Sequence, residues 1–489
     1  MKFRYLVAWI TGLLLAGFVL EGILRDSPAG DEVERQQVSA EEMGEGRLPE
    51  LLERLGALEP VAGTGARSAA GEDARPAWRT PPAAAEPGRS AAGRSPDSTA
   101  LRELVPFHFR RKGLRTVSIH TDPQGLEWIR QQPMEQREVP AAVAVLEGQR
   151  VLFTAYAGLR LHGGTTRTFG PSRSWRLMFR AGDGFAPSLL GWAAGPALES
   201  LIIRNSLRVD RGDRQWRYTN AMAFDVVRRM GGEVPHTAPA LLFINGENRG
   251  FFFLTERIDR GFLRRRYGHD RFVFVWTKDA DYRSIVRWGN PLLYERLMDL
   301  FPTRTKAGPR RVARWVDLDN LDRWFLSVLF CATTDAYQGA LLRDEGDPAG
   351  RWFWLHWDMD QSFMAALADR LDPWNSDIWS TVTEGSRHDL RARLLRSLTV
   401  RSEEYRRRLA GRAALMLDRQ LTPPFLAELL GRYREIERRY EVDDTESLEL
   451  IGRFFEERPR VLRQRLAERL GPLPAPHDDP LAANAADPR

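Results

Sequence analysis

The chain is poor in cysteine and in lysine. Among its 489 residues there is one cysteine, Cys331, and only four of the 72 basic residues are lysines. A single cysteine excludes an intrachain disulfide. Its place in the apolar run FLSVLFCATTD indicates a buried structural thiol rather than a nucleophile. The eight histidines form no H-E-x-x-H pattern, so the sequence argues against a zinc site.

Charge of one sign is not concentrated in any segment. The net charge is +6 and the basic residues are almost all arginines, but these are mixed with acids and form no basic tail. Nucleic-acid binding usually requires a basic patch or stripe, so no nucleic-acid partner is expected. Hydrophobic residues make up 43% of the chain, which is sufficient for a globular core.

The N-terminus carries a long apolar run. Lys2 and Arg4 precede an apolar stretch from Tyr5 to Leu20, which resumes after Glu21 and is just long enough to span a bilayer. The basic flank predicts that the N-terminus lies inside and the rest of the chain lies outside the cytoplasm. Residues 1–25 are therefore expected to be a membrane anchor, with the body periplasmic or at the surface. A cleaved signal peptide, which would give a secreted protein, is the alternative.

Aromatic residues are scarce in two segments. Residues 26–103 are rich in Ala, Gly, Pro, Glu and Arg, and residues 472–489 have a similar composition. Such segments bury too little apolar surface to fold. A disordered linker and a disordered tail are expected, and the folded body is expected to occupy residues 104–471.

The body changes from strand-like to helical patterns along its length. RTVSIHT, AAVAVLE and AGLRLH alternate as strands do, and two apolar runs flank Asn245–Gly246 as in a hairpin. Helical spacing occurs over 214–230, in VDLDNLDRWFLSVLFCATT and from 390 to 470. These patterns predict an α+β fold with two lobes, the first rich in strands and the second helical.

The motif WDMD gives the strongest signal for chemistry. If Asp358 and Asp360 lie on a strand, both carboxylates face the same side. Two like charges so close together are costly unless a cation neutralises them, and a divalent ion that also binds phosphate oxygens is the usual solution. The alternative is a strand end with solvated acids.

Two further acids stand at the ends of apolar elements. Asp335 follows the apolar helical segment, where a base would be held rigidly, and Glu256 ends the run FFFLTE, where it could orient a lysine or bind a metal. Lys278 lies on an expected strand, FVFVWTK. The alternatives are a loop aspartate and a hairpin glutamate that pairs with one of the arginines.

The stretch HGGTTR could bind an anion. Its two glycines and two threonines could present N–H and hydroxyl groups, and nearby arginines could add charge. It matches neither G-x-G-x-x-G nor a P-loop, so a plain turn is the alternative. The candidate anion-binding residues are His162, Gly163, Gly164, Thr165, Thr166, Arg167 and Arg173.

Five separated motifs, taken in order, resemble the CotH kinase family of atypical protein kinases. AGLRLHGGTTR resembles the family segment G-x-R-x-(R/H)-G-x-(S/T)-(S/T), and SWRLMFR resembles the basic strand that follows it. FINGENRGFFFLTERID is similar to the family hairpin. VDLDNLDRWFLSVLFCATTDAY resembles the helix that leads to a family aspartate, and RWFWLHWDMDQSF resembles its W-D-x-D strand. The likeness extends over about residues 115–470.

The resemblance implies a divergent two-lobed kinase fold that uses ATP with Mg²⁺ or Mn²⁺. HGGTT would cover the nucleotide phosphates, and Asp335 would correspond to the catalytic aspartate. Glu256 and Lys278 would be supporting polar groups. The metal ligands implied by the motifs are Asp358, Asp360 and Gln338.

Three functions remain open from the sequence. The first is a CotH-like kinase that phosphorylates Ser or Thr of an envelope or coat protein. The second is an inactive scaffold of the same fold, because Ala340 stands where the family tends to have a metal-binding asparagine, Met364 departs from the family pattern and lysines are few. The third is a metal-dependent glycosyltransferase that uses the D-x-D motif.

Overall fold

The structure is a computed structural model that describes residues 95–474 with short gaps. The gaps are 136, 165–166, 168–172, 180–183, 206–207, 210–214, 279–282, 364–374, 385–388 and 444. The expected membrane segment, most of the expected linker and the tail from residue 475 therefore lie outside the described residues. Within the described ranges, no helix is long and apolar enough to cross a bilayer.

The folded part begins before residue 104, where the sequence placed the end of the linker. Residues Ser98–Glu103 form helix α4, and the Asp97 side chain caps it by accepting hydrogen bonds from two backbone N–H groups. Ala100 and Leu101 are buried completely in the core. The burial of these two apolar side chains is enough to hold the segment against the core, although its composition resembles that of a linker.

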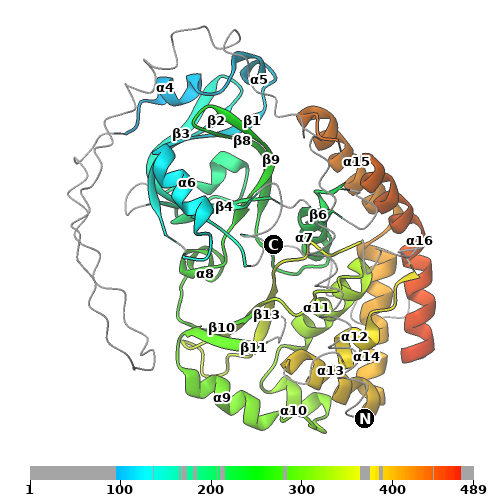
Figure 1. Cartoon of the computed structure of the whole chain (residues 1–489). Coiled ribbons are helices and arrows are strands. Elements are labelled where there is room, and N and C mark those ends of the chain that lie inside the picture. Colours follow the sequence, from blue (N-terminus) through cyan, green and yellow to red (C-terminus); the bar gives the residue numbers. More distant parts are fainter. Residues whose placement is uncertain are drawn as a thin grey trace, which may run out of the picture.

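Seven strands in the described part of the chain close into a barrel (Figure 1). Their spatial order is β1-β2-β3-β4-β5-β9-β8, and only the β1–β8 pair is parallel. The strands are β1 (Arg115–Thr121), β2 (Val139–Glu147), β3 (Arg150–Leu161), β4 (Trp175–Phe179), β5 (Ser200–Arg204), β8 (Thr237–Ile244) and β9 (Glu247–Glu256).

Alternation along these strands separates an apolar interior from a basic exterior. Leu159 and Leu161 of β3 belong to the core inside the barrel, and Arg160 between them takes the outward position. In β4, Arg176 stands outward between Trp175 and Leu177 in the same way. The outer faces of neighbouring strands therefore carry positive charge side by side.

The β8–β9 hairpin forms where the sequence predicts it. Ile244 pairs with Glu247, so Asn245 and Gly246 alone make the turn. Both have positive φ, 53° and 82°, which is the backbone of a type I′ turn and explains the Asn-Gly pair.

A second sheet packs beside the barrel. Its strand order is β11-β10-β12-β13, and helix α8 (Arg260–Tyr267) precedes it in the chain. Ile202, on the outer face of β5, shares an apolar cluster with Phe262 of α8, with Phe274 of β10 and with Trp357. The strands are β10 (Phe272–Lys278), β11 (Arg283–Trp288), β12 (Gly339–Asp344) and β13 (Phe353–His356).

The helix expected over 214–230 begins only at Thr219. Gln215–Trp216 instead form the short strand β7, which pairs with β6 (Arg208–Val209).

Helices make up the rest of the body, and the fold is α+β as expected. The main helices are α7 (Thr219–Arg229), α11 (Leu318–Cys331), α13 (Leu390–Arg401), α14 (Glu403–Leu415), α15 (Pro423–Tyr440) and α16 (Thr445–Leu470). The shorter ones are α5 (Phe107–Arg111), α6 (Pro123–Gln131), η2 (Pro187–Leu190), α9 (Pro291–Leu300), α10 (Pro309–Ala313), α12 (Trp379–Glu384) and the π-helical turn η5 (Met416–Gln420).

One apolar core joins the helices to the barrel. It runs from α4 and the outer face of β9 through α7 and α11 to the C-terminal helices.

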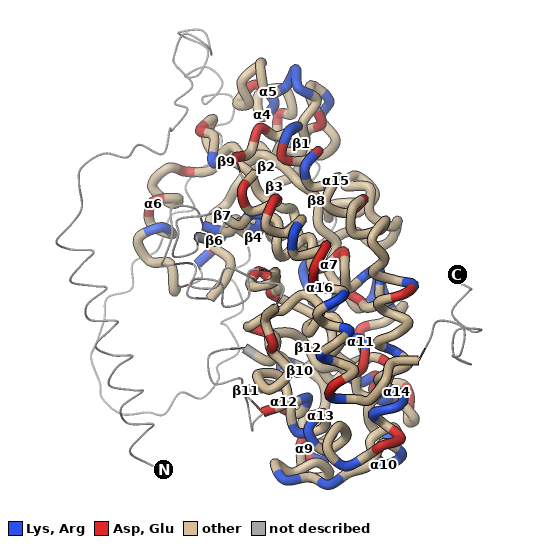
Figure 2. The backbone as a smooth tube through the Cα atoms, turned by 90° about the vertical axis from the view of Figure 1, so that its right-hand side faces the viewer, with Lys and Arg blue, Asp and Glu red and all other residues tan. Residues whose placement is uncertain are grey.

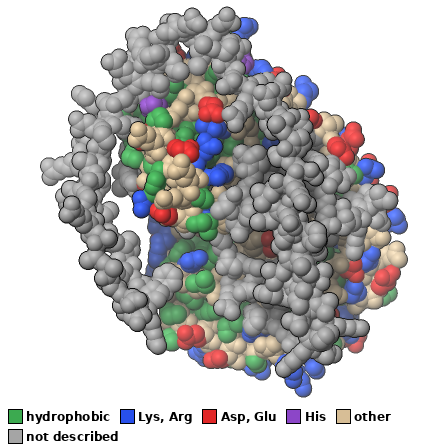
Figure 3. Space-filling model, in the orientation of Figure 1, with side chains coloured by type: hydrophobic (Ala, Val, Ile, Leu, Met, Phe, Trp, Pro, Cys, Tyr) green, Lys and Arg blue, Asp and Glu red, His purple; other side chains and the backbone are tan. Residues whose placement is uncertain are grey.

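Charges of both signs are mixed on the surface. Acidic and basic residues both occur along the helices on the side shown in Figure 2, and both signs are also interspersed on the face shown in Figure 3.

Candidate functional site

The WDMD motif lies at the edge of the second sheet, just beyond the end of β13. The sequence-based expectation that Asp358 and Asp360 share one face of a strand is wrong, because β13 ends at His356 and Asp358 has a left-handed backbone with φ 56°. Aspartate tolerates this conformation better than most residues. The two carboxylates nevertheless approach the same partner, because the turn brings them back together.

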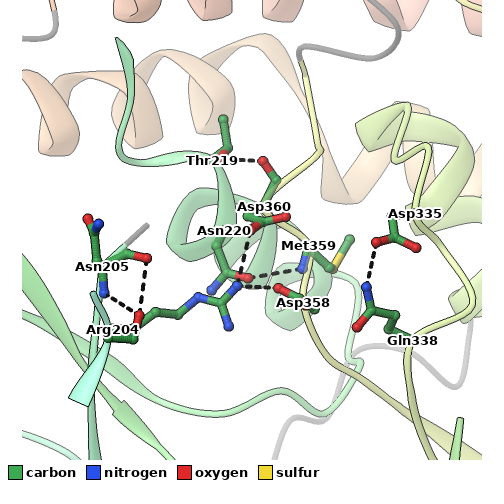
Figure 4. A network of polar contacts seen from close by, with 10 residues as sticks. Arg204, Asn205, Thr219, Asn220, Asp335, Gln338, Asp358, Met359 and Asp360 are labelled. Carbon is green, nitrogen blue, oxygen red and sulfur yellow. Dashed lines mark hydrogen bonds and ion pairs between the residues drawn. The ribbon is translucent and has the colours of Figure 1, made fainter. Parts of the chain in front are cut away.

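That partner is an arginine. The Arg204 guanidinium at the end of β5 forms an ion pair with Asp358, and its Nη2 lies 3.4 Å from Oδ2 of Asp360 (Figure 4). The exposed fractions of the three side chains are 9%, 25% and 13%. Burial lowers the pKa of Arg204, but the two carboxylates raise it more, so the net shift is upward. A guanidinium thus neutralises the acids for which the sequence implied a divalent cation.

Helix α7 fixes the backbone of the motif. The Thr219 hydroxyl donates to the carbonyl oxygen of Asp360 at 2.8 Å, and the Asn220 side chain accepts from the N–H of Met359 at 2.9 Å (Figure 4). Both residues are buried and stand in the first turn of α7. The position of the two aspartates therefore depends on where α7 begins.

Asp335 lies in the turn that follows α11. The Gln338 side-chain amide donates to Oδ2 of Asp335 (Figure 4). Ala332, the C-terminal cap of α11, has φ 50° and ends the helix before this turn. In the described structure Gln338 therefore contacts the candidate catalytic aspartate, whereas the sequence assigned it to a metal.

Three hydrogen bonds tie this turn to the segment after WDMD. The Thr334 hydroxyl donates to the Gln361 side chain at 2.9 Å, and the hydroxyls of Thr333 and Ser362 lie 2.7 Å apart. The N–H of Phe363 donates to the carbonyl oxygen of Cys331 at 2.7 Å. Asp335 and the two motif aspartates consequently belong to adjoining segments of one site.

Strand register brings Lys278 to the same edge. Thr277 of β10 pairs with Gly339 of β12, and Gly339 pairs with His356 of β13. The next residues beyond this row are Lys278, Gln338 and Trp357. The Lys278 side chain lies outside the described part of the structure, so only its place in the sheet is known.

Glu256 pairs with arginines. One of its oxygens accepts from Nε and Nη2 of Arg265 at 3.0 and 2.9 Å, and the other accepts from Arg266 at 3.1 Å and from the N–H of His236 at 3.3 Å. Glu256 is only 2% exposed. It anchors α8 against the end of β9, and its partners in the described structure are not the lysine that the sequence suggested.

The HGGTT stretch follows β3 directly. Gly163 has φ 114°, a conformation that side chains rarely adopt. Thr165, Thr166 and Met364 lie outside the described residues. Arg167 donates to the carbonyl oxygens of Gly164 and Pro133, at 3.3 and 3.2 Å.

Arg173 is likewise held by backbone, because it donates to the carbonyl oxygen of Arg130 at 2.7 Å. His162 contacts Trp357 edge to face, with ring centroids 6.3 Å apart. Burial, and then the charge of neighbouring arginines led by Arg204, hold the pKa of His162 well below its usual value. His162 is therefore neutral at pH 7.

The sequence reasoning missed the arginines of the outer barrel face. Arg160, Arg176, Arg204 and Arg257 all lie close enough to His162 to lower its pKa. The signal of the first three was present in the alternation of LRL, WRL and IIR, where each arginine stands between or after inward apolar residues; Arg257, just after β9, had no such signal. This basic face of β3, β4 and β5 lies on the same side of the barrel as the second sheet.

The described residues do not fit a divalent-cation site in this arrangement. Among them, no group of three or more His, Cys, Asp and Glu side chains could hold a metal ion. Arg204 already neutralises Asp358 and Asp360. Ala340, at the place of the expected asparagine, is buried in the cluster between barrel and second sheet and offers no ligand atom.

Comparison with known proteins identifies the family. No curated protein matches this chain. A family model described as CotH kinase protein matches residues 159–471, from the end of β3 to the end of α16. The match includes the HGGTT stretch, the hairpin, Asp335 and WDMD, and it covers more than half of the chain. The chain therefore belongs to the CotH kinase family.

Proposed function

We propose that this chain is a CotH-type phosphotransferase that transfers phosphate from a nucleotide to Ser or Thr of an envelope or coat protein. The observation that supports this most directly is the set of hydrogen bonds between the turn after α11 and the segment after β13. They hold Asp335 beside the WDMD motif. Phosphoryl transfer needs little more than positioned charge and an acid that orients the hydroxyl.

Asp335 is the group best suited to that role. It stands on a turn fixed by α11, and Gln338 donates to one of its oxygens, which leaves the carboxylate oriented. In the proposed reaction Asp335 accepts a hydrogen bond from the substrate hydroxyl and directs it towards the transferred phosphate. The basic outer face of the barrel would hold the phosphates.

Family membership suggests ATP with Mg²⁺ or Mn²⁺. Asp358 and Asp360 supply the kind of oxygen atoms that such ions prefer, but Arg204 occupies both. We assign no step of the reaction to a metal. In the proposed kinase-like arrangement, the barrel with its second sheet forms one lobe and the helices form the other.

The substrate follows from the proposed location. We propose that residues 1–25 anchor the chain in a membrane and that the body lies outside the cytoplasm, periplasmic or at the surface. A protein of the envelope or coat is then the available Ser- or Thr-bearing substrate.

Transfer from γ-labelled ATP tests the proposal. The full-length chain, purified in detergent, would be assayed with Mg²⁺, Mn²⁺ or EDTA against itself and casein. Asp335→Asn should lower transfer by about 100-fold or more, and Glu403→Gln, an exposed acid on α14, is the matched control. Folded protein that binds no nucleotide and transfers no phosphate would refute the proposal.

A non-catalytic scaffold is the second candidate, and one observation favours it. Arg204 satisfies the two aspartates within the protein, whereas an active site usually leaves such acids for its cofactor. If the chain is a scaffold, the Asp335→Asn and Asp358→Asn variants should be folded and stable and should retain the wild-type function in assembly of the envelope.

A further inference from the structure

Two arginines face each other on the outer barrel surface. Arg160 of β3 and Arg176 of β4 are direct cross-strand partners. Directly opposed side chains of antiparallel strands lie about 5 Å apart at Cβ, and like charges in such a pair are destabilising. A fold that places two guanidinium groups there requires something that compensates for the repulsion.

Among the residues that the structure describes, Arg176 has no counterion. It is 8% exposed, its Nε is buried without a hydrogen-bond partner, and no carboxylate of the described residues lies within ion-pair distance of it. Burial, followed by the charges of Arg257 and Arg160, lowers the pKa of Arg176 to about 9. Burying an unpaired charge costs several kcal/mol or more, so this side chain is held in an unfavourable state.

The nearby acids are engaged elsewhere. Asp259 caps α8 by accepting from the N–H of Phe262, and its other oxygen accepts from the Ser200 hydroxyl at 3.0 Å and lies 3.8 Å from Arg257. Asp259 and Glu138 raise the pKa of Arg176 less than burial lowers it. Neither acid forms an ion pair with Arg176 in the described structure.

The other basic groups at the site are likewise accounted for. Arg204 is paired with Asp358 and Asp360, Arg167 donates to backbone carbonyls, and His162 is held neutral. Arg160 and Arg176 form no ion pair among the described residues, and the charge of Glu138, which raises the pKa of both, does not outweigh their burial. They lie on strands that flank the HGGTT stretch, where the phosphates of a nucleotide are expected.

We propose that Arg160 and Arg176 bind the phosphate groups of a nucleoside polyphosphate directly, without a divalent cation. This inference rests on the nucleotide-binding part of the proposed function. Paired guanidinium groups offer charge-assisted, bidentate hydrogen bonds to phosphate oxygens. They supply the positive charge that a metal ion would otherwise bring. This agrees with the ion pairs in which Asp358 and Asp360 are already bound to Arg204.

Isothermal titration of the full-length chain in detergent tests this proposal. ATP, pyrophosphate and adenosine would each be titrated in EDTA and in Mn²⁺. ATP and pyrophosphate should bind in EDTA, with Kd changed less than about threefold by Mn²⁺, and adenosine should bind far more weakly. Arg176→Gln and Arg160→Gln should each weaken binding by about 10-fold or more, as expected for lost hydrogen bonds to a charged group.

Arg150→Gln is the matched control. It lies on the same strand as Arg160, is exposed and pairs with Glu147, and its Kd should equal that of the wild type. If Arg176→Gln does not fold, the more exposed Arg160→Gln carries the test alone. Because removal of an unpaired buried charge relieves strain, Arg176→Gln should also unfold at the same or a higher temperature than the wild type.

Each contrary result has a distinct meaning. Binding that requires Mn²⁺, or that survives both substitutions, would overturn the inference, even if phosphate transfer is observed and the proposed function holds. Cation-free binding that depends on both arginines, without any transfer, would support the inference and refute the kinase. Adenosine that binds as well as ATP would show that the base rather than the phosphates is recognised, and would also overturn the inference.

Discussion

At the residue scale, Arg204 decides what the two motif aspartates can do. Arg204→Ala would leave two partly buried carboxylates without their cation, which should lower the free energy of unfolding by about 2–4 kcal/mol. It would also open a pair of adjacent carboxylates to a divalent ion. Millimolar Mn²⁺ should therefore raise the melting temperature of the variant more than that of the wild type, as measured by thermal unfolding.

The control is Arg150→Ala, which removes an exposed ion pair with Glu147. Its stability should change by less than about 1 kcal/mol and its response to Mn²⁺ should match the wild type. An equal response to Mn²⁺ in wild type and Arg204→Ala would show that Arg204 does not compete with a cation at this site.

At the element scale, α16 holds the end of α11 through one buried side chain. Arg458 is 1% exposed and donates to the carbonyl oxygens of Leu329, Phe330 and Ser376. Two of these carbonyls belong to the last turn of α11, which leads to Asp335. The helix that precedes the catalytic candidate is therefore capped from a position far along the chain.

Arg458→Met should lower the free energy of unfolding by about 3 kcal/mol, because it leaves buried carbonyls unsatisfied. It should also speed the reaction of Cys331, the only cysteine, with a thiol reagent, since that buried thiol sits at the end of α11. Arg460→Met, which removes an exposed i,i+3 pair with Glu457, should leave both measurements unchanged. Equal labelling rates in the two variants would contradict the capping role.

A second link between elements predicts sensitivity to acid. His356 of β13 is buried, and its Nε2 lies 2.8 Å from the Ser327 hydroxyl of α11. Burial, with a smaller effect of Arg391, lowers the pKa of His356 to about 3. Below pH 6.5 the unfolded chain gains a proton that the folded chain does not, so stability falls as pH decreases from 6.5 towards 3.

His356 alone should account for about 2 kcal/mol of that loss at pH 5. His356→Gln keeps a group that can bond to Ser327 and should make the decline between pH 7 and pH 5 shallower by this amount, as measured by urea unfolding. His236 remains in both proteins. Burial lowers its pKa to about 4, so it also contributes to the decline in stability between pH 7 and pH 5. Identical pH profiles would show that His356 is protonated in the folded state.

At the scale of the whole molecule, barrel and helices should unfold together. The barrel residue Phe251 lies 5.3 Å from Tyr440 of α15 between ring centroids, and the Tyr440 hydroxyl donates to the carbonyl oxygen of Pro239 on β8. Both rings belong to the core that continues through the helices. A single cooperative transition is expected, with coincident near- and far-UV circular dichroism curves in urea. Two separated transitions would show that the shared core does not couple the two parts.

The sequence predicts the elements of this fold better than its contacts. Asn245–Gly246 and the apolar periodicity before Asp335 depend on local backbone preferences, and both appear where they were expected. The closure of the barrel was not predicted, because the β1–β8 pairing joins segments more than 100 residues apart and leaves no local pattern.

The same limit applies to the candidate site. Asp335, Asp358 and Asp360 were found as motifs, and strand register shows why Lys278 and Gln338 lie near them. Arg204 was missed, although it ends the apolar run LIIR at residues 201–204, since its pairing with WDMD is a tertiary contact across 154 positions. Whether an acid is left for a ligand or neutralised within the protein is decided by such contacts and not by the motif.

The parallel pairing of β1 with β8 also has a consequence for biosynthesis. Thr116–Ile119 can pair with β2 early, but they acquire their β8 partners only when Leu241–Ile244 have been made. At typical ribosomal speeds this delay is on the order of ten seconds. Throughout that interval β1 presents an unpaired edge, which is a template for pairing with other chains. We therefore expect a nascent chain of this protein to depend on chaperones until the β8–β9 hairpin emerges, and slower translation of the intervening codons would lengthen the exposure.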